Sequence, residues 1–266
     1  MSEGTTKVLL HNGEVGGEVR PLYFYQAFGL AVALARIISF GACNFACPYC
    51  KRDGAFRDDD GSIVTAVDTD LEQLFRVCDD AVEKGQIVRL SGGDPVVFPS
   101  QSLAIASYMR EKHGQKISMA HNGSSPAFAA RMAPFLSSAA IDLKALPQEM
   151  NLRAGLTNGT GSKMFARSIE TQDHLSSQGV LVDIRTPIFG TTTLDDILAL
   201  ASEIVRGGRS DREFWTWRLY RPVRGCDWTA PNKEQVLWMI GEVKALFPEL
   251  KIGLRAKWEP EGFLYF

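Results

Sequence analysis

Short apolar runs alternate with longer helical patterns along most of this 266-residue chain. This alternation is typical of repeated strand–helix units, which build a parallel sheet. The apolar runs predict strands at Ala35–Phe40, Ile87–Leu90, Lys116–Ala120, Ala140–Leu143, Val180–Thr186, Glu213–Tyr220 and Lys251–Leu254. The intervening patterns predict helices at Asp70–Lys84, Gln101–His113, Pro126–Leu136, Lys163–Gln178, Leu194–Val205 and Lys233–Phe247. We therefore expect an α/β fold of six or seven such units.

Composition narrows the class of protein. The net charge of −2 gives no basic surface for nucleic acid, so we expect no nucleic-acid partner. The most apolar stretch, Ala27–Phe40, contains Arg36 and is shorter than the roughly 20 residues that cross a membrane. The N-terminal residues lack the pattern of a signal peptide. Five cysteines, three of them clustered, argue against a disulfide framework and predict a reducing, cytoplasmic location.

Three cysteines, Cys43, Cys47 and Cys50, directly follow the predicted strand that ends at Phe40. Thiolates at such short spacings can converge on one soft metal centre, and cubic iron–sulfur clusters are held by cysteine sulfur. No fourth cysteine is nearby, so three ligands face four irons and one iron stays open to another ligand. An open coordination position is a reactive one. A zinc site with a distant fourth ligand is the alternative interpretation.

A second motif, Ser91-Gly92-Gly93-Asp94-Pro95, follows the next predicted strand. Alone it predicts only a turn between a strand and a helix. Its order after the cysteine motif makes the pair more specific, since each follows an apolar run in the predicted context. Together, the CxxxCxxC spacing with Tyr49 before its last cysteine and the GGDP turn resemble the signature of radical S-adenosylmethionine (radical SAM) enzymes.

The resemblance implies a fold and two cofactors. The fold would be a partial (β/α)6 TIM-like barrel over residues 35–266, with a C-terminal strand segment and with residues 1–34 packing on it as an N-terminal extension. A [4Fe-4S] cluster on Cys43, Cys47 and Cys50 would bind S-adenosylmethionine (SAM) at its open iron. An external electron donor of flavodoxin or ferredoxin type would then drive cleavage of SAM to a 5′-deoxyadenosyl radical that abstracts hydrogen.

Polar residues follow the later predicted strands, where ligands bind in parallel α/β sheets. These are His121-Asn122-Gly123, Asp142-Leu143-Lys144, the run from Arg185 to Gly190, and Leu219-Tyr220-Arg221-Pro222. This series resembles the activating enzymes of glycyl radical enzymes, those for pyruvate formate-lyase and anaerobic ribonucleotide reductase. The resemblance implies SAM contacts from Tyr49, Gly92, Gly93, Asp94, Asn122, Asp142, Lys144, Arg185 and Ile188.

In that assignment Gly92, Gly93 and Asp94 take the SAM amino group, and Tyr49 and Ile188 flank the adenine. Asn122, Asp142, Lys144 and Arg185 would surround the ribose and the methionyl carboxylate. Simpler interpretations stay open. Asp142 and Lys144 face the same side of a strand and could pair with each other, and His121 could cap a loop.

The chain also departs from those activating enzymes. Ala120 stands where they carry an aspartate that helps to bind a monovalent cation, and no histidine lies near the last strand. Two classes of substrate therefore remain, a glycyl radical enzyme or a small molecule. In the second class, Arg218, Arg221 and Arg224 would supply charge for a phosphate or carboxylate, although strand alternation prevents all three from pointing inward. A non-catalytic iron–sulfur or zinc protein is a weaker third possibility.

Two further cysteines lie outside the motif. Cys78 falls within a helical pattern and is expected to be a small core residue. Cys226, beside Trp228, either faces the site or packs against its neighbours.

Overall fold

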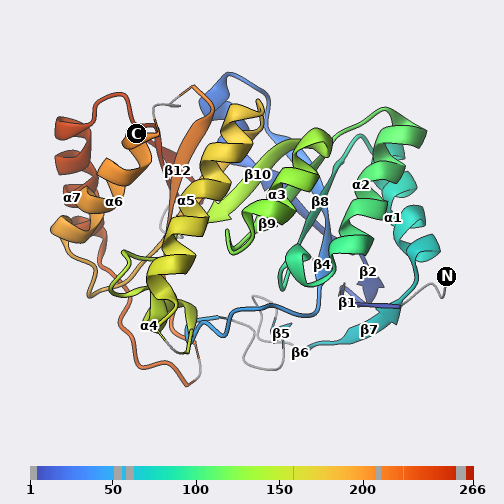
Figure 1. Ribbon diagram of the computed structural model, residues 1–266, viewed down its shortest axis with the longest axis horizontal. Coiled ribbons are helices and arrows are strands. Elements are labelled where there is room, and N and C mark those ends of the chain that lie inside the picture. The colour runs from blue at the N-terminus through green and yellow to red at the C-terminus, as the bar shows by residue number, and fades with distance from the viewer. Residues whose placement is uncertain are drawn as a thin grey trace.

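The computed structural model describes residues 5–50, 56–57, 63–157, 159–207, 211–223, 225–255 and 262–266. Its centre is a 12-stranded sheet, and the long helices all cover one face of it (Figure 1). The strand order is β14-β13-β12-β11-β10-β9-β8-β4-β1-β2, with β3 beside β4 and β7 beside β1. The predicted α/β fold is confirmed.

Seven neighbouring strands of the sheet are parallel, as the apolar runs predict. They are β4 (Ala33–Phe40), β8 (Ile87–Gly92), β9 (Ile117–His121), β10 (Leu136–Asp142), β11 (Leu181–Ile188), β12 (Glu213–Leu219) and β13 (Ile252–Arg255). The six long predicted helices are present as α1 (Leu71–Glu83), α2 (Pro99–His113), α3 (Pro126–Met132), α5 (Gly161–Ser177), α6 (Leu194–Arg206) and α7 (Lys233–Leu246).

The two largest boundary errors are of equal size: α3 was predicted to reach Leu136, and β10 was predicted to begin at Ala140. The α-helix stops at Met132, a short 3-10 turn follows, and β10 already begins at Leu136. Pro134 contributes to the early stop, because a proline has no amide hydrogen to donate to the carbonyl group four residues earlier and so interrupts the α-helical hydrogen bonds.

Several short elements were not predicted. They are β1 (Thr6–His11), β2 (Glu14–Val15), β3 (Glu18–Leu22), the 3-10 helices η1 (Tyr23–Phe28) and η2 (Pro95–Val97), β5 (Phe56–Arg57), β6 (Ile63–Val64), β7 (Ala66–Thr69), η3 (Ala133–Phe135), α4 (Met150–Ala154) and β14 (Leu264–Tyr265). The N-terminal strands β1 and β3 both pair antiparallel with β4 and extend the sheet beyond its parallel part.

The two faces of the sheet bury different sets of side chains. On β11 and β12, Ile184 and Trp215 belong to the large core between the sheet and the helices. Leu181 and Phe214 belong instead to a smaller core on the opposite face, which also holds Tyr25 from η1. We call this opposite face the inner face. The strand period of two therefore divides each strand between a helix-covered core and the inner face.

The inner face changes character along the strands. At its amino end, η1 covers the sheet and the apolar cluster fills the space beneath it. At its carboxyl end, the segment that follows β4 runs below the strands toward α4 (Figure 1). No helix within the described ranges is both long and apolar enough to span a membrane.

The helix-side core should dominate the stability of the fold. Leu90 of β8 is fully buried there, so Leu90→Ala should lower the free energy of unfolding by about 2–5 kcal/mol in urea denaturation. Leu246→Ala is the matched control, because that side chain is 63% exposed and its loss should cost less than about 0.5 kcal/mol. Equal effects of the two substitutions would contradict this placement of the core.

Candidate active site

The three clustered cysteines lie on the segment that leaves β4 at the carboxyl edge of the sheet. We call residues 41–50 the cysteine loop. Cys43 is exposed, whereas Cys47 and Cys50 are half-buried, and all three thiols are free. The loop therefore lies where the carboxyl ends of the parallel strands meet, the edge at which such folds bind ligands.

Backbone contacts hold the start of the loop against the GGDP turn. The Asp94 amide donates to the Ala42 carbonyl at 2.7 Å, and the Gly93 amide donates to the Phe40 carbonyl. A Cβ atom on Gly93 would lie 1.8 Å from the Ala42 oxygen, which no real contact allows. Glycine is required here because two backbones approach more closely than any side chain permits.

A second contact holds the middle of the loop against α4. The Ala46 amide donates to the Ala154 carbonyl at 3.2 Å. Gly155, at the end of α4, has a positive φ of 60°, and a Cβ there would lie 1.9 Å from the Ala46 oxygen. The two contacts position both ends of the segment that carries Cys43 and Cys47.

The donor chemistry of the loop fits an iron–sulfur cluster, since three free thiols lie within eight residues and sulfur is the ligand that such clusters use. Although Cys43 is exposed as a residue, partial loss of water around its thiol raises its pKa to about 11. Burial also raises the pKa of Cys47, and the Lys144 cation opposes the shift at both thiols. Within the described residues, no three metal-binding side chains are already gathered at one point. The Cys43 and Cys47 thiols are therefore protonated in this state and would have to lose their protons to bind iron.

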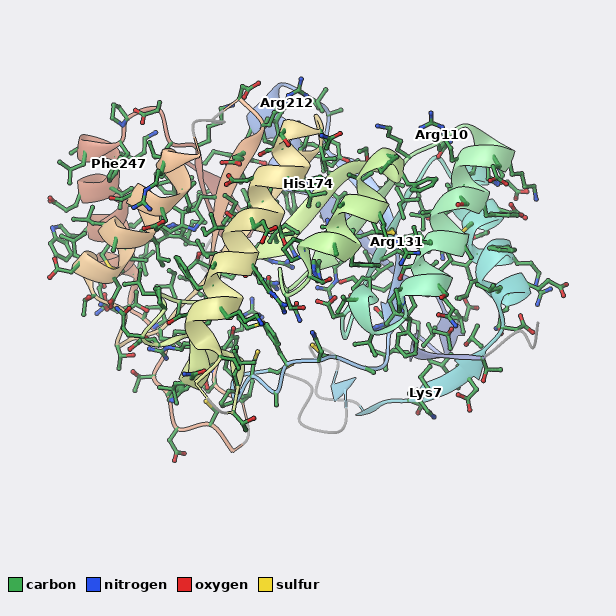
Figure 2. All side chains as sticks on the ribbon, in the orientation of Figure 1. Lys7, Arg110, Arg131, His174, Arg212 and Phe247 are labelled. Carbon is green, nitrogen blue, oxygen red and sulfur yellow. The ribbon has the colours of Figure 1, made fainter. Side chains whose placement is uncertain are left out.

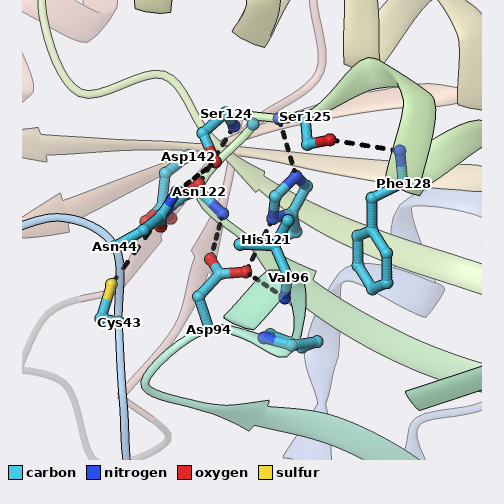
Figure 3. A network of polar contacts seen from close by, with 12 residues as sticks. Cys43, Asn44, Asp94, Val96, His121, Asn122, Ser124, Ser125, Phe128 and Asp142 are labelled. Atoms are coloured by element: carbon cyan, nitrogen blue, oxygen red, sulfur yellow. Dashed lines mark hydrogen bonds and ion pairs between the residues drawn. The ribbon is translucent and has the colours of Figure 1, made fainter. Parts of the chain in front are cut away.

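A polar network connects Cys43 with the end of β9 (Figure 3). The Asn122 amide group donates to Asn44 Oδ1 at 2.7 Å and makes a longer contact of 3.8 Å with Cys43 Sγ. Asn44 in turn donates to Ser124 Oγ at 2.9 Å. Asn122 was predicted to contact SAM, and the structure places it beside the first motif cysteine.

Asp94 is buried and fully engaged with the same strand end. Its carboxylate accepts hydrogen bonds from the amides of Asn122 and Val96 at 2.7 and 3.0 Å, and it lies 2.8 Å from His121 Nδ1 (Figure 3). The Ser125 amide donates to His121 Nε2, so Nδ1 carries the proton that the Asp94 carboxylate accepts. Of the two interpretations of His121, the structure supports the one in which it orders a loop. The Asp94 carboxylate connects the GGDP turn with the end of β9.

Asp142 and Lys144 form an ion pair of 2.6 Å at the end of β10. Burial alone would raise the pKa of Asp142, but the Lys144 ammonium outweighs it and leaves that pKa below the ordinary value. Lys144 responds in the opposite sense: burial would lower its pKa, but Asp142 raises it well above the ordinary value. The structure therefore agrees with the simpler interpretation, in which Asp142 and Lys144 neutralise each other's charge.

The remaining predicted contacts divide between the two faces. Arg185 lies on the inner face and pairs with Asp183 at 2.7 Å. Ile188 is fully buried in the core between the sheet and the helices, so the expected contact with adenine has no exposed surface to use. Its position in β11 gives it the helix-side orientation of Ile184, which alternation along that strand would have indicated.

Tyr49 belongs to an aromatic cluster that the sequence did not reveal. Its ring contacts Phe189 and Trp228, with centroids 5.1 and 5.7 Å away. Arg153 of α4 lies over the same two rings, 4.2 Å from Phe189 and 4.6 Å from Trp228, and is 6% exposed. The local signals of this helix were the four-residue spacing of Glu149 and Arg153, which pair at 3.0 Å, and Gly155 directly after it.

The open questions about the other cysteines and arginines are partly resolved. Cys78 is buried in the helix-side core, as predicted, and burial raises its pKa to about 12. Cys226 is half-buried next to Tyr220, whose hydroxyl donates to the Cys226 carbonyl at 3.4 Å. Arg218 is exposed, Arg221 is half-buried, and Arg224 lies outside the described residues.

The close approach of Gly93 yields a stability prediction. Gly93→Ala should destabilise the fold by about 1–3 kcal/mol, because the added methyl group overlaps the Ala42 carbonyl and must displace the cysteine loop. Gly241→Ala in α7 is the control: its Cβ would meet nothing within 4 Å, and alanine should stabilise the helix by up to about 1 kcal/mol. Denaturant unfolding measures both stabilities, and a Gly241→Ala variant less stable than the Gly93→Ala variant would contradict the proposed overlap with Ala42.

The lowered pKa of Asp142 predicts the sign of a pH effect. Its contribution to stability is present above the ordinary pKa of about 4 and is lost as the pH falls through the lower value in the folded protein. The stability difference between wild type and Asp142→Asn should therefore shrink as the pH falls from about 6 to about 3. In a Lys144→Met background this dependence should weaken or invert, because burial is then less opposed; an unchanged dependence would exclude Lys144 as the cause.

Comparison with known proteins identifies the family of the chain. Residues 37–204 match the radical SAM superfamily. The 7-carboxy-7-deazaguanine synthase of Methanothermobacter thermautotrophicus is 26% identical over 186 residues, which cover 68% of this chain and 72% of the synthase. The GTP 3′,8-cyclase of Campylobacter fetus subsp. fetus is 30% identical over 99 residues, covering 37% of this chain and only 30% of the cyclase.

Solved structures share the fold at lower identity. A radical SAM methyltransferase from Sphaerobacter thermophilus superposes with a TM-score of 0.61 at 16% identity, covering 95% of this chain and 73% of that one. Methylornithine synthase gives a TM-score of 0.59 at 14% identity, covering 82% and 63%. The family uses a [4Fe-4S] cluster and SAM, and its signature begins on the strand that carries the cysteine loop. The chain belongs to the radical SAM superfamily.

Proposed function

We propose that this protein is a radical SAM enzyme that modifies a small anionic molecule in a biosynthetic pathway. The observation that carries the proposal is the packing of the cysteine loop on the GGDP turn, through the Ala42–Gly93 contact, at the ligand-binding edge of the sheet. A [4Fe-4S] cluster with SAM supplies reductive cleavage to a 5′-deoxyadenosyl radical, which abstracts hydrogen.

The residues of the chain take distinct roles in this proposal. Cys43, Cys47 and Cys50 hold the cluster as thiolates. Backbone groups of Gly92 and Gly93 take the SAM amino group, while their missing side chains admit the backbone of Phe40 and Ala42 on the side of the cysteine loop. Asp94 acts as a positioning residue, since its carboxylate is committed to His121 and to the Asn122 amide.

Other side chains surround the rest of SAM. Tyr49 supplies an aromatic surface for adenine, backed by Phe189 and Trp228. Asn122, Lys144 and Arg185 contact its polar groups. Lys144 approaches Tyr49, with its ammonium 5.8 Å from the ring centroid, so cation and aromatic surface are presented together.

The class of substrate follows from the relatives and from the charge of the site. One relative is named for a carboxylated deazaguanine and another for GTP, so both names specify small molecules that carry anionic groups. They favour the small-molecule alternative over the activation of a glycyl radical enzyme, which the motifs at the strand ends first indicated. Several arginines on the inner face supply cationic charge for such a substrate.

The proposal also requires an electron source. A flavodoxin or ferredoxin would deliver the electron, and the free state of all five cysteines agrees with work in the reducing cytoplasm.

Reconstitution under anaerobic conditions tests the proposal. Protein supplied with iron and sulfide should bind one [4Fe-4S] cluster and, once reduced, should convert SAM into 5′-deoxyadenosine and methionine. Alanine at Cys43, Cys47 or Cys50 should abolish both cluster and product, whereas Cys78→Ala should retain the cluster because that thiol lies in the core. Iron analysis and product chromatography measure the two effects. S-adenosylhomocysteine as the sole nucleoside product, or a cluster that survives loss of a loop cysteine, would contradict the proposal.

A further inference from the structure

One cation on the inner face of the sheet is buried without a full set of partners. Arg89 of β8 is 3% exposed, and its Nη1 group donates to Ser118 Oγ at 3.2 Å. Its Nη2 group is buried and has no hydrogen-bond partner among the described residues. An unsatisfied buried donor costs about 1–3 kcal/mol, and more when it is charged, so such a group commonly marks a missing ligand.

Two further arginines share this face. In the strand register, Arg89 lies opposite Ile37 of β4 and opposite Ser118 of β9. Ile37 belongs to the smaller core on the inner face, so Arg89 lies on that face too. Arg185 lies four residues after Leu181 on β11, and Arg218 lies four residues after Phe214 on β12, so both arginines are on the inner face with these two core residues. Although β9 and β10 separate β8 from β11, Arg89 and Arg185 face the same side of the sheet, and the Arg185 charge contributes to lowering the pKa of Arg89.

The nearby acids do not neutralise this group. Asp183 already accepts hydrogen bonds from Arg185 Nε and Thr216 Oγ1. Asp142 is paired with Lys144. Burial and repulsion from Arg185 lower the pKa of Arg89 to about 9. Arg218 keeps exposed surface on this face, but partial loss of water around its guanidinium and repulsion from Arg185 lower its pKa to about 9 as well, so both side chains are charged at neutral pH. On this part of the inner face, Arg89 and Arg218 are therefore cations whose nearby carboxylates, Asp183 and Asp142, are already paired with other side chains.

The location suits a substrate below the cysteine loop. Arg89 lies three residues before Gly92, so at about 3.3 Å per residue it is about 10 Å deeper than the GGDP turn. Between these levels the inner face carries small side chains, among them Ser91, Ala120 and Ala140. Beneath Arg89, the apolar cluster of η1 closes the face.

We propose that Arg89 and Arg218 bind an anionic group of the substrate, a carboxylate or a phosphate, on the inner face of the sheet. This inference rests on the proposed function and specifies where its substrate is held. An oxyanion there satisfies Arg89 Nη2 and offsets the repulsion among the arginines. The planar guanidinium presents paired donors in the geometry that carboxylates and phosphates accept. Arg185, held by Asp183, stays available to orient SAM above it.

Thermal unfolding of the reconstituted protein tests this site with simple probes. Inorganic phosphate and acetate are titrated separately against chloride at constant ionic strength, and the midpoint Tm is recorded. Occupancy of the site should raise the Tm of the wild type by about 2–4 °C. A response to phosphate alone assigns a phosphate group, and a response to acetate alone assigns a carboxylate; no response to either overturns the site.

Two variants locate the response. Arg89→Met should abolish it and should itself raise the Tm in chloride, because methionine removes a buried charge with an unsatisfied donor. Arg218→Met, at an exposed position where folding is not at risk, should also abolish the response. Arg131→Met, on the outer surface of α3, is the control and should respond like the wild type (Figure 2). A wild-type response in both Arg89→Met and Arg218→Met would overturn the proposal, as would a lower Tm of Arg89→Met in chloride.

This test is separate from that of the proposed function. Formation of 5′-deoxyadenosine by the wild type without an anion response would overturn the anion site alone. An anion response without any cleavage of SAM would overturn the proposed function and leave an anion-binding protein.

Discussion

The backbone contact between Ala42 and Gly93 is the constraint on which the rest of the site depends. It joins two motifs about fifty residues apart in the sequence, and it does so with main-chain atoms that no side chain may separate. Gly155 makes an equivalent contact with Ala46 from α4. A loop that must present three thiols to one cluster cannot be left free, because each degree of freedom that binding removes would reduce the affinity.

A second constraint is the division of the inner face into an apolar and a polar part. Tyr25 of the 3-10 helix η1 and Phe214 fill its amino end, so the sheet is supported there without an α-helix. Arg89, Asp183 and Arg185 occupy the part nearer the cysteine loop, where burial of charge is unfavourable unless each group is paired. The structure accepts that cost next to the site, which is where proteins commonly sacrifice stability for function.

The parallel sheet and its helices were predictable because local patterns encode them. Alternation along β11 placed Asp183 and Arg185 on the face opposite Ile184, and glycines at 85, 114 and 179 adopt the left-handed conformation expected after helices. The pairing of β1 and β3 with β4 was not predictable, since it joins segments whose own sequences specify neither partner nor register. The aromatic cluster around Arg153 was missed for the same reason.

The same distinction between local pattern and tertiary contact applies to the functional motifs. Their positions at strand ends followed from sequence, but their partners did not. The commitment of Asp94 to His121, the pairing of Asp142 with Lys144 and the burial of Ile188 are all tertiary facts. Each changes what the residue can do for SAM. Strand alternation indicates the orientation of Ile188 and makes the Asp142–Lys144 pair one of the interpretations, but the spacing of the motifs does not encode the bond between Asp94 and His121.

The central claim is that three cysteines of one docked loop leave one iron of the cluster for SAM. Electron–nuclear double resonance of the reduced protein, with SAM isotopically labelled at its amino nitrogen, tests this claim most directly. The account predicts hyperfine coupling of the labelled nitrogen to the cluster, seen as a signal characteristic of the label that is replaced by the signal of ordinary nitrogen when unlabelled SAM is used. A reduced cluster whose spectrum shows no coupling and does not change on addition of SAM would contradict it.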